Sequence, residues 1–446
     1  MTIAVMKTKA EQGFVDQFDA AVGTLPGTAT VLDLRREAIK DFANLGLPHR
    51  RVEEWKYTDL RTQMREGFAR ADGGVFGTQV IAETLDGTSY GLVEGLESYT
   101  IIFADGAFVT STLPKDLAGV ESLALHDALT QLPSWVTDAL AETSVPNDGV
   151  VALNTAYMSG GMALRIGDGI SVDKPIHVVF AATGGQPKAV TTRCIIVTGR
   201  GSKVTVFESH ISTETAPRQQ NALVQISIGD QAEVHHVKSL TVDAGSIHLA
   251  NGIVRLGKHA AYKPFLMTTG AGYTRTTLNV TFEGQHAMLD LSSVALADHA
   301  GHSDLTMVID HAVPNCTSRE LFKAVLDGSS KGVFQGKVIV RPDAQKTDGK
   351  QMARGLLLTP EAEFYSKPEL EIYADDVVCG HGTTSMELDQ DMMFYCRSRG
   401  IPEAEARTLL VESFIGEAID KIEHDGLRTG LMTKARAWLS ATATAK

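Results

Sequence analysis

Cys379 and His381, separated by a single glycine, are the most distinctive chemical feature of the sequence, within PELEIYADDVVCGHGTTS at 368–385. Residues i and i+2 of a strand face the same side, so the thiolate and the imidazole can point together. Gly380 and Gly382 leave the backbone bare, which lets a ligand or another chain approach closely. Thiolate sulfur and imidazole nitrogen both bind iron and iron–sulfur clusters, but a partner would have to supply the remaining ligands. From the residues alone, the alternative is a half-buried free cysteine beside a structural histidine.

Histidines gather in two further places. Four lie close together in the sequence, and two more are adjacent: His286, His299, His302, His311, and the pair His235 and His236. Imidazoles on neighbouring strands can bind a transition metal. Adjacent residues of a strand point to opposite faces, so the adjacent pair cannot easily share one ion. The alternative is a set of solvated or hydrogen-bonded histidines that bind no metal.

The elements that position these residues fall into three stretches, and we predict a helical region at 1–95, a β core at 96–387 and a helical region at 388–446. In TVLDLRREAIKDFANLGLP the apolar residues recur at helical spacing, and Gly46 and Pro48 then end the helix. The predicted buried face of this helix consists of Leu34, Ala38, Ile39, Phe42 and Leu45.

The middle stretch consists of short alternating apolar segments separated by glycine and polar residues, which is typical of strands. A glycine-led pattern recurs there at an almost constant interval, in GSKVTV, GDQAEV, GKHAAY and GQHAML, beginning at Gly201, Gly229, Gly257 and Gly284. A period of roughly 28 residues indicates stacked β units, as in a β-helix or solenoid, and is too short for a propeller blade. A large sandwich with evenly spaced turns is the alternative.

The last stretch returns to helix. Pro402 suits a first helical position, and the apolar residues that follow recur at i, i+4: Leu410, Phe414, Ala418 and Ile422, with Ile415 and Ile419 beside them. We expect this helix to pack on the β core. Its apolar face can also receive a partner.

Composition excludes several functional classes. The net charge is −13, which disfavours general nucleic-acid binding. No apolar run is long enough for a membrane helix and no secretory h-region is present, so we expect neither a membrane span nor export. The cysteines, without CxxC spacing, are expected to be free thiols of a cytoplasmic protein: Cys194, Cys316, Cys379 and Cys396. Without a phosphate loop, a dinucleotide fingerprint, a nucleophile elbow or HExxH, we expect no bound ATP or flavin.

The C-terminal part of the chain resembles the C-terminal core of the SufB/SufD family of SUF iron–sulfur cluster assembly scaffolds. Three segments carry this resemblance: LEIYADDVVCGHGTT, MFYCRSRGIPEAEAR and ESFIGEAID. LGLPHRRVEEWKYTDLR at 45–61 is similar to the SufD branch in particular. The resemblance covers the whole chain, and its motif blocks are long and specific.

The resemblance implies a mainly β fold, with a right-handed parallel β-helix core flanked by N-terminal and C-terminal α-helical regions. It implies pairing with the paralogue SufB through the β-helix core, and docking of the ATPase SufC on the C-terminal helices. It also implies that the chain is not an enzyme. His381, with Cys379 as an auxiliary, becomes a candidate ligand of a nascent, transient Fe–S cluster shared with SufB, and an isolated chain can form a homodimer through the same surface.

SufB itself carries a cysteine after a glutamine in a Q-C-D segment, whereas here TDGKQMARGLLLT at 347–359 places Met352 after Gln351. This departure favours SufD and implies that the chain is not the primary sulfur acceptor. Two other functions stay open: a purely architectural subunit without a cluster ligand, and a stand-alone β-helix carbohydrate-active enzyme. The candidate acids of such an enzyme are Asp375, Asp376, Asp290, Asp298 and Asp304.

Overall fold

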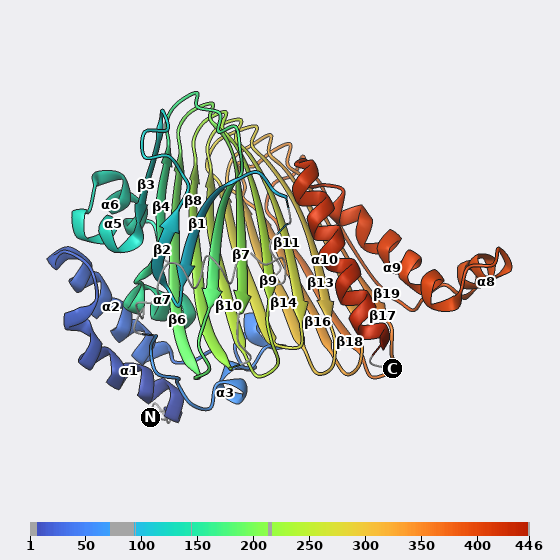
Figure 1. Ribbon diagram of the computed structural model, residues 1–446. Coiled ribbons are helices and arrows are strands. Elements are labelled where there is room, and N and C mark those ends of the chain that lie inside the picture. The colour runs from blue at the N-terminus through green and yellow to red at the C-terminus, as the bar shows by residue number, and fades with distance from the viewer. Residues whose placement is uncertain (1–6, 72–92, 94, 144, 213–215, 445–446) are drawn as a thin grey trace.

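The computed structural model of the chain describes residues 7–71, 93, 95–143, 145–212 and 216–444. Long strands run side by side through the middle of the molecule, with the N-terminal helices at one end and the C-terminal helices towards the other (Figure 1). Among the described residues, no helix is long and apolar enough to cross a membrane.

The helix predicted before Gly46 is α2 (Ala29–Leu45), which ends there because Gly46 adopts a φ of 72° that L-residues rarely take. Of its predicted buried face, Ala38, Ile39 and Phe42 are buried, whereas Leu45 is 40% exposed. The neighbouring elements of this region are α1 (Lys9–Ala21), η1 (Val22–Thr24), η2 (Glu53–Trp55) and α3 (Leu60–Gln63).

The strands form two mainly parallel sheets, and from β4 onward each successive strand joins the other sheet. The first sheet contains β1 (Tyr99–Ala104), β2 (Ala107–Ser111), β5 (Ile176–Ala182), β7 (Lys203–Ser212), β9 (Glu233–Thr241), β11 (Ala261–Gly270), β13 (Met288–Ala297), β15 (Thr317–Leu326), β17 (Asp348–Leu357) and β19 (Val378–Met386). The second contains β3 (Val120–Ala124), β4 (Gly160–Ile166), β6 (Lys188–Thr198), β8 (Arg218–Ile228), β10 (Ile247–Leu256), β12 (Tyr273–Phe282), β14 (His302–His311), β16 (Lys331–Val340) and β18 (Glu363–Ile372).

This alternation makes the core a parallel β-solenoid, as predicted, in which each turn adds one strand to each sheet. The sandwich alternative is wrong, because sandwich strands pair antiparallel whereas each strand from β5 to β19 pairs in parallel with an earlier strand of its own sheet. Apolar side chains fill the space between the sheets: Phe322 of β15 stacks on Phe334 of β16, with ring centroids 5.6 Å apart.

The predicted repeat corresponds to the turns that join the second sheet to the first. At Gly229 and Gly284 an added Cβ would lie 2.6 Å and 2.0 Å from backbone atoms of the preceding turn, so only glycine fits. Gly201 does not occupy the same position. Gly201 has a φ of 65°, close to the φ of 61° at Gln231, which lies two residues after Gly229. Gly201 therefore corresponds to Gln231, and Gly199 is the residue of the first repeat that corresponds to Gly229.

In the described part of the segment 96–387, which the sequence predicted to be a β core, the structure contains three helices: α5 (Leu125–Gln131), α6 (Ser134–Ala141) and α7 (Gly149–Tyr157). Asp148 caps α7 by accepting hydrogen bonds from the Val150 and Val151 amides at 2.8 and 3.0 Å. Short apolar runs such as GVVAL do not distinguish a buried helix from a strand, so the pattern could not reveal them. Domain boundaries at 95 and 387 stay predictions.

The C-terminal region comprises α8 (Gln390–Ser398), α9 (Glu403–Ile419) and α10 (Asp425–Thr444). The predicted packing of α9 is confirmed: Ile415, Ala418 and Ile419 are fully buried in an apolar cluster that includes outward-facing residues of the first sheet. In contrast, α8 projects away from the sheets (Figure 1). Phe394 and Tyr395 on α8 are 74% and 56% exposed.

Candidate functional site

The solenoid ends in two strands that no further described strand covers. β18 and β19 are the last members of the two sheets, so one edge of each lacks a hydrogen-bonding neighbour among the described residues. Large apolar side chains are exposed on and beside these strands: Tyr365, Ile372, Tyr373, Val378 and Met386. An unpaired edge with exposed apolar side chains is suited to receive another chain.

Cys379 and His381 lie on β19, and alternate residues of the strand share one face. Cys379 is half-buried against the interior apolar cluster, while His381 is exposed. Burial raises the pKa of the Cys379 thiol, and the nearby Asp348 and Glu320 raise it further. The free thiol is therefore protonated at neutral pH, and a bound cation would have to displace its proton.

Gly380, between the two donors, faces the opposite side of β19. A Cβ built there meets no other described residue within 4 Å, so that face of the strand is open to an approaching chain. The donor set is one thiol and one imidazole, which suits iron or an iron–sulfur cluster. Two donors at an exposed edge form part of a site that a neighbouring chain could complete.

The other predicted histidines do not come together. His302 approaches Thr58 and stacks on Tyr273, whereas His311, at the opposite end of β14, contacts Ser318 and stacks on Phe282. The remaining two lie in turns, where His286 stacks on His259 and His299 pairs with Asp298. These four described histidines therefore form no common metal site.

His235 and His236 face opposite sides of β9, as predicted. His236 points inward, where it contacts Tyr262 and Glu208 at 3.1 and 3.2 Å. His235 points outward towards Glu233 and Glu423, and its Nε2 lies 3.6 Å from Glu423.

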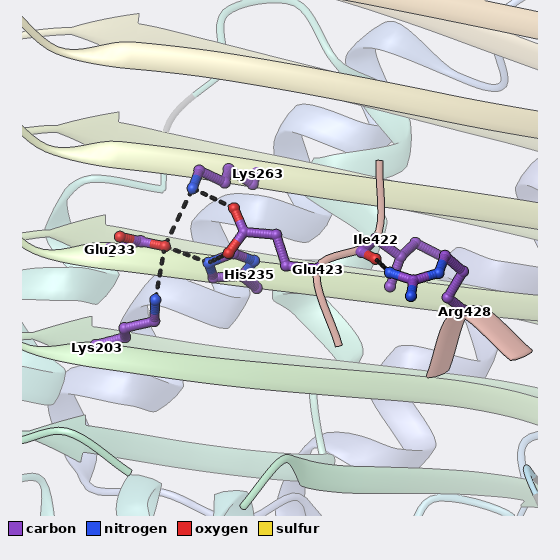
Figure 2. A network of polar contacts seen from close by, with 7 residues as sticks. All are labelled: Lys203, Glu233, His235, Lys263, Ile422, Glu423 and Arg428. Carbon is purple, nitrogen blue, oxygen red and sulfur yellow. Dashed lines mark hydrogen bonds and ion pairs between the residues drawn. The ribbon is translucent and has the colours of Figure 1, made fainter. Parts of the chain in front are cut away.

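The outward network is shown in Figure 2, and it is a grouping that the sequence did not reveal. Glu233, His235 and Glu423 each offer one ligand atom within 4.8 Å of the others. Lys263 already bridges the two carboxylates at 3.1 and 2.5 Å, and Lys203 binds Glu233 at 3.1 Å. Since two ammonium groups neutralise the two carboxylates, the arrangement works as an ionic latch that ties the α9–α10 loop to the solenoid.

We expect acid to open this latch. Burial opposes ionisation of Glu233, but hydrogen bonds from His235, Lys203 and Lys263 outweigh it and lower its pKa from 4.5 to about 2. The hydrogen bond from Lys263 likewise lowers the pKa of Glu423. A lowered folded-state pKa contributes stability that is present above pH 4.5 and is lost as the pH falls towards 2.

Hydrogen exchange of segment 420–430 should therefore accelerate over this range, relative to the intrinsic rate and to β13–β15 as a marker of global unfolding. Glu233→Gln should let the segment exchange rapidly already at neutral pH, and its protection should then change little as the pH falls. Equal protection of the segment at pH 5 and pH 3 in the wild type would contradict the latch.

The segment 45–61 clamps the N-terminal region onto the second sheet. Trp55 stacks under the Arg275 guanidinium at 3.9 Å, and Thr58 donates to Asp304. Tyr57 stacks on Tyr365 of β18, with ring centroids 5.1 Å apart, so the clamp reaches the open end. These contacts give the motif a structural role.

The five aspartates of the carbohydrate-enzyme alternative are dispersed over different elements, and four of them form ion pairs. Asp304 is buried against Arg275, Asp290 pairs with Lys421 at 2.5 Å, and Asp298 pairs with His299. Asp376 pairs with Lys346 in the turn before β19, which also contains Asp375. Four of the five carboxylates are thus held in local ion pairs, and the five do not come together in one group.

Comparison with known proteins agrees with this architecture. Residues 180–414 match the family described as "SUF system FeS cluster assembly, SufBD core domain", and residues 8–178 match the "SufBD protein N-terminal region". The chain is 30% identical to a SufBD family protein of Synechocystis, with 88% of each chain covered. It is 25% identical to SufD of Escherichia coli, covering 90% of this chain and 91% of that one. It is 26% identical to SufD of Bacillus subtilis, covering 66% and 69%.

The first of these family matches covers more than half of the chain, and it includes the strands from β6 to β19 and the Cys379–His381 pair. A solenoid with an open end, flanked by helical regions and matching this family over nearly its whole length, has one consistent assignment: the chain belongs to the SufBD family of the SUF iron–sulfur cluster assembly system.

Proposed function

We propose that this chain is a SufD-type scaffold subunit, which pairs with SufB at the open end of its solenoid and docks SufC through its C-terminal helices. The observation that carries the proposal is the Cys379–His381 pair on the terminal strand, where a second solenoid could supply further ligands. SufD-named relatives that align over most of the chain support the assignment.

The assignment to SufD rather than SufB rests on one residue of β17. Met352 follows Gln351 where SufB carries its sulfur-accepting cysteine, and a thioether cannot accept a persulfide sulfur. In this proposal sulfur reaches the complex through the partner, and the present chain contributes ligands and shape.

Docking of SufC is proposed for α8 and the adjoining start of α9. Phe394 and Tyr395 expose aromatic rings on a helix that packs little against the body, since Met393 is its buried residue. Aromatic side chains dominate the energetics of protein interfaces. ATP hydrolysis by the docked subunit would then shift the two solenoids and open or close the shared site.

In the proposed site, His381 and Cys379 bind one side of a nascent Fe–S cluster that is the cargo of the complex. The exposed imidazole of His381 can bind a metal without rearrangement of the chain. Cys379 lies deeper and must first lose its proton. The alternative that the chain is purely architectural differs in one respect, that neither side chain contacts the cluster.

Anaerobic reconstitution with SufB and SufC separates these functions. We expect wild type and His381→Ala to form the same complex in a pull-down, and the variant to lose most of its cluster absorption in the visible range. His126→Ala is the matched control, because His126 is an exposed histidine on α5, at the other end of the solenoid.

Equal cluster bands in wild type and His381→Ala would make the chain an architectural partner. Failure of the wild type to form a complex would refute the partner assignment itself.

A further inference from the structure

The interior of the solenoid near its open end contains buried polar atoms that lack partners. Both carboxyl oxygens of Glu320 and Oε1 of Gln351 are inaccessible and have no hydrogen-bond partner of good geometry within the described part of the chain. Ser318 is close enough to lower the pKa of Glu320 slightly, but its hydroxyl group contacts His311 instead. Each of the two residues is only 2% exposed. A buried polar group without a partner costs about 1–3 kcal/mol, so two of them side by side require an explanation.

These side chains lie directly behind the proposed cluster ligands. Glu320 of β15 is in register with Gln351 of β17, which is in register with His381 of β19. In the adjacent column, Ser318, Gly349 and Cys379 occupy the same three strands. Strands are about 4.8 Å apart, so the Glu320 backbone lies roughly 10 Å behind that of His381. The ligand atoms of Glu320, Cys379 and His381 do not all lie within 4.8 Å of one another in the described structure, so a shared ion requires these side chains to turn towards it.

The column faces the interior. Phe322, two residues after Glu320, and Ala353, two residues after Gln351, both belong to the apolar cluster between the sheets. Cys379 packs against the same cluster, so its thiol and the Glu320 carboxyl face the same interior space. Carboxyl, amide oxygen, thiol and imidazole thus follow one another from the interior to the open edge.

We propose that Glu320 is a further ligand of this chain for divalent iron, lying behind Cys379 and His381 and reached through the open end of the solenoid. This inference rests on the proposed function, and it assigns the metal to a site that extends into this subunit. A carboxylate and a thiolate would together balance the two charges of Fe²⁺, and Gln351 offers a neutral oxygen between them. On binding, the carboxyl and thiol protons pass to solvent, and no electron is transferred.

Burial raises the pKa of Glu320 to about 8, so the metal-free protein holds a neutral carboxyl group at this position. Glutamine has the same shape and is also neutral, so Glu320→Gln should fold normally while lacking an ionisable oxygen. Leucine provides a second test. Replacing an unpartnered polar group by an apolar one is neutral or stabilising, so Glu320→Leu should unfold at the same or a higher denaturant concentration.

The experiment is an anaerobic titration of the isolated full-length protein with Fe²⁺ by calorimetry, and with Co²⁺ by visible absorption. We expect both Glu320 variants to bind about 10- to 100-fold more weakly than wild type, the loss typical of a weakened metal site. His381→Ala should also weaken binding. Glu361→Gln, at an exposed turn next to β18, should bind as wild type does.

Equal affinities in wild type and both Glu320 variants, with weaker binding by His381→Ala, would overturn the role of Glu320 and leave the proposed function intact. Absence of any Fe²⁺ or Co²⁺ binding by wild type would also overturn it. Failure of the proposed function has a different signature, namely unchanged cluster bands of His381→Ala in the reconstituted complex.

Discussion

Asp304→Ala should lower the free energy of unfolding by about 3–5 kcal/mol, the loss observed when one partner of a buried ion pair is removed. Asp304 and Arg275 are 0% and 2% exposed, and the guanidinium lies 2.6 Å from the carboxylate. Thr306 also donates to Asp304 at 2.9 Å, and Thr58 donates from the N-terminal clamp. Alanine would leave the Arg275 charge buried without its counter-ion.

Denaturant unfolding monitored by circular dichroism measures this loss. The double variant Asp304→Leu with Arg275→Met should recover much of it, because apolar side chains replace the pair without an orphaned charge. Glu66→Ala is the control, since the Lys9–Glu66 pair is exposed and its removal should leave the unfolding curve unchanged. If Asp304→Ala unfolded with the wild-type curve, the buried pair would not anchor the N-terminal clamp.

The partners of the N-terminal clamp could not be predicted from the sequence. The segment 45–61 stood out as a family motif, but its role depends on Arg275, Asp304 and Tyr365, which lie far away in the chain. No periodicity links Trp55 to Arg275. Only the folded solenoid, which brings β12, β14 and β18 together in one sheet, gives Trp55 a partner.

The solenoid was predictable for the opposite reason. Each turn contacts mainly the next, so the constraint repeats locally and appears in the sequence as evenly spaced glycines. Gly229 and Gly284 are fixed by close approach of the preceding turn, and such steric demands are visible in a single sequence. The helices at 125–157 interrupt this regularity without a periodic signal, so they were missed.

The candidate site was partly predictable. The i, i+2 spacing placed Cys379 and His381 on one face of a strand, but not at the last strand of the sheet. Glu320 has no motif around it, and its burial follows from three-dimensional packing alone. The latch of Glu233, His235 and Glu423 was hidden for the same reason, because Glu423 approaches β9 from a loop near the other end of the chain.

Thr383→Pro should weaken pairing with SufB by roughly 100-fold if the two solenoids join through β19. The Val378 amide donates to Thr347 of the preceding turn at 2.8 Å, and donors alternate along a strand. Even-numbered residues of β19 therefore bond to β17, and the amides of Cys379, His381, Thr383 and Ser385 point outward. Proline at 383 removes one outward donor and places its ring against the incoming strand, an effect of about 3 kcal/mol.

Of the two terminal strands, β19 is the one that can pair with a partner, because the open edge of β18 carries a proline. The Glu363 amide donates to Ser330, so the even-numbered residues of β18 point outward, and Pro368 is one of them. Natural edge strands use proline in this position to block pairing, and Pro368 also shows that a proline there leaves its own strand intact. β19 has no such block among its described residues, so its edge can accept a partner strand.

The affinity for SufB can be measured by biolayer interferometry with three variants. Thr383→Ala keeps the amide and should bind as wild type does, whereas Thr383→Pro should lose binding and keep its melting temperature. Thr384→Pro removes a donor to β17 instead, so it should lower the melting temperature. If Thr383→Pro bound SufB with wild-type affinity, the subunits would have to meet through side chains of the open end, and the exposed Val378 and Met386 would carry the contact instead.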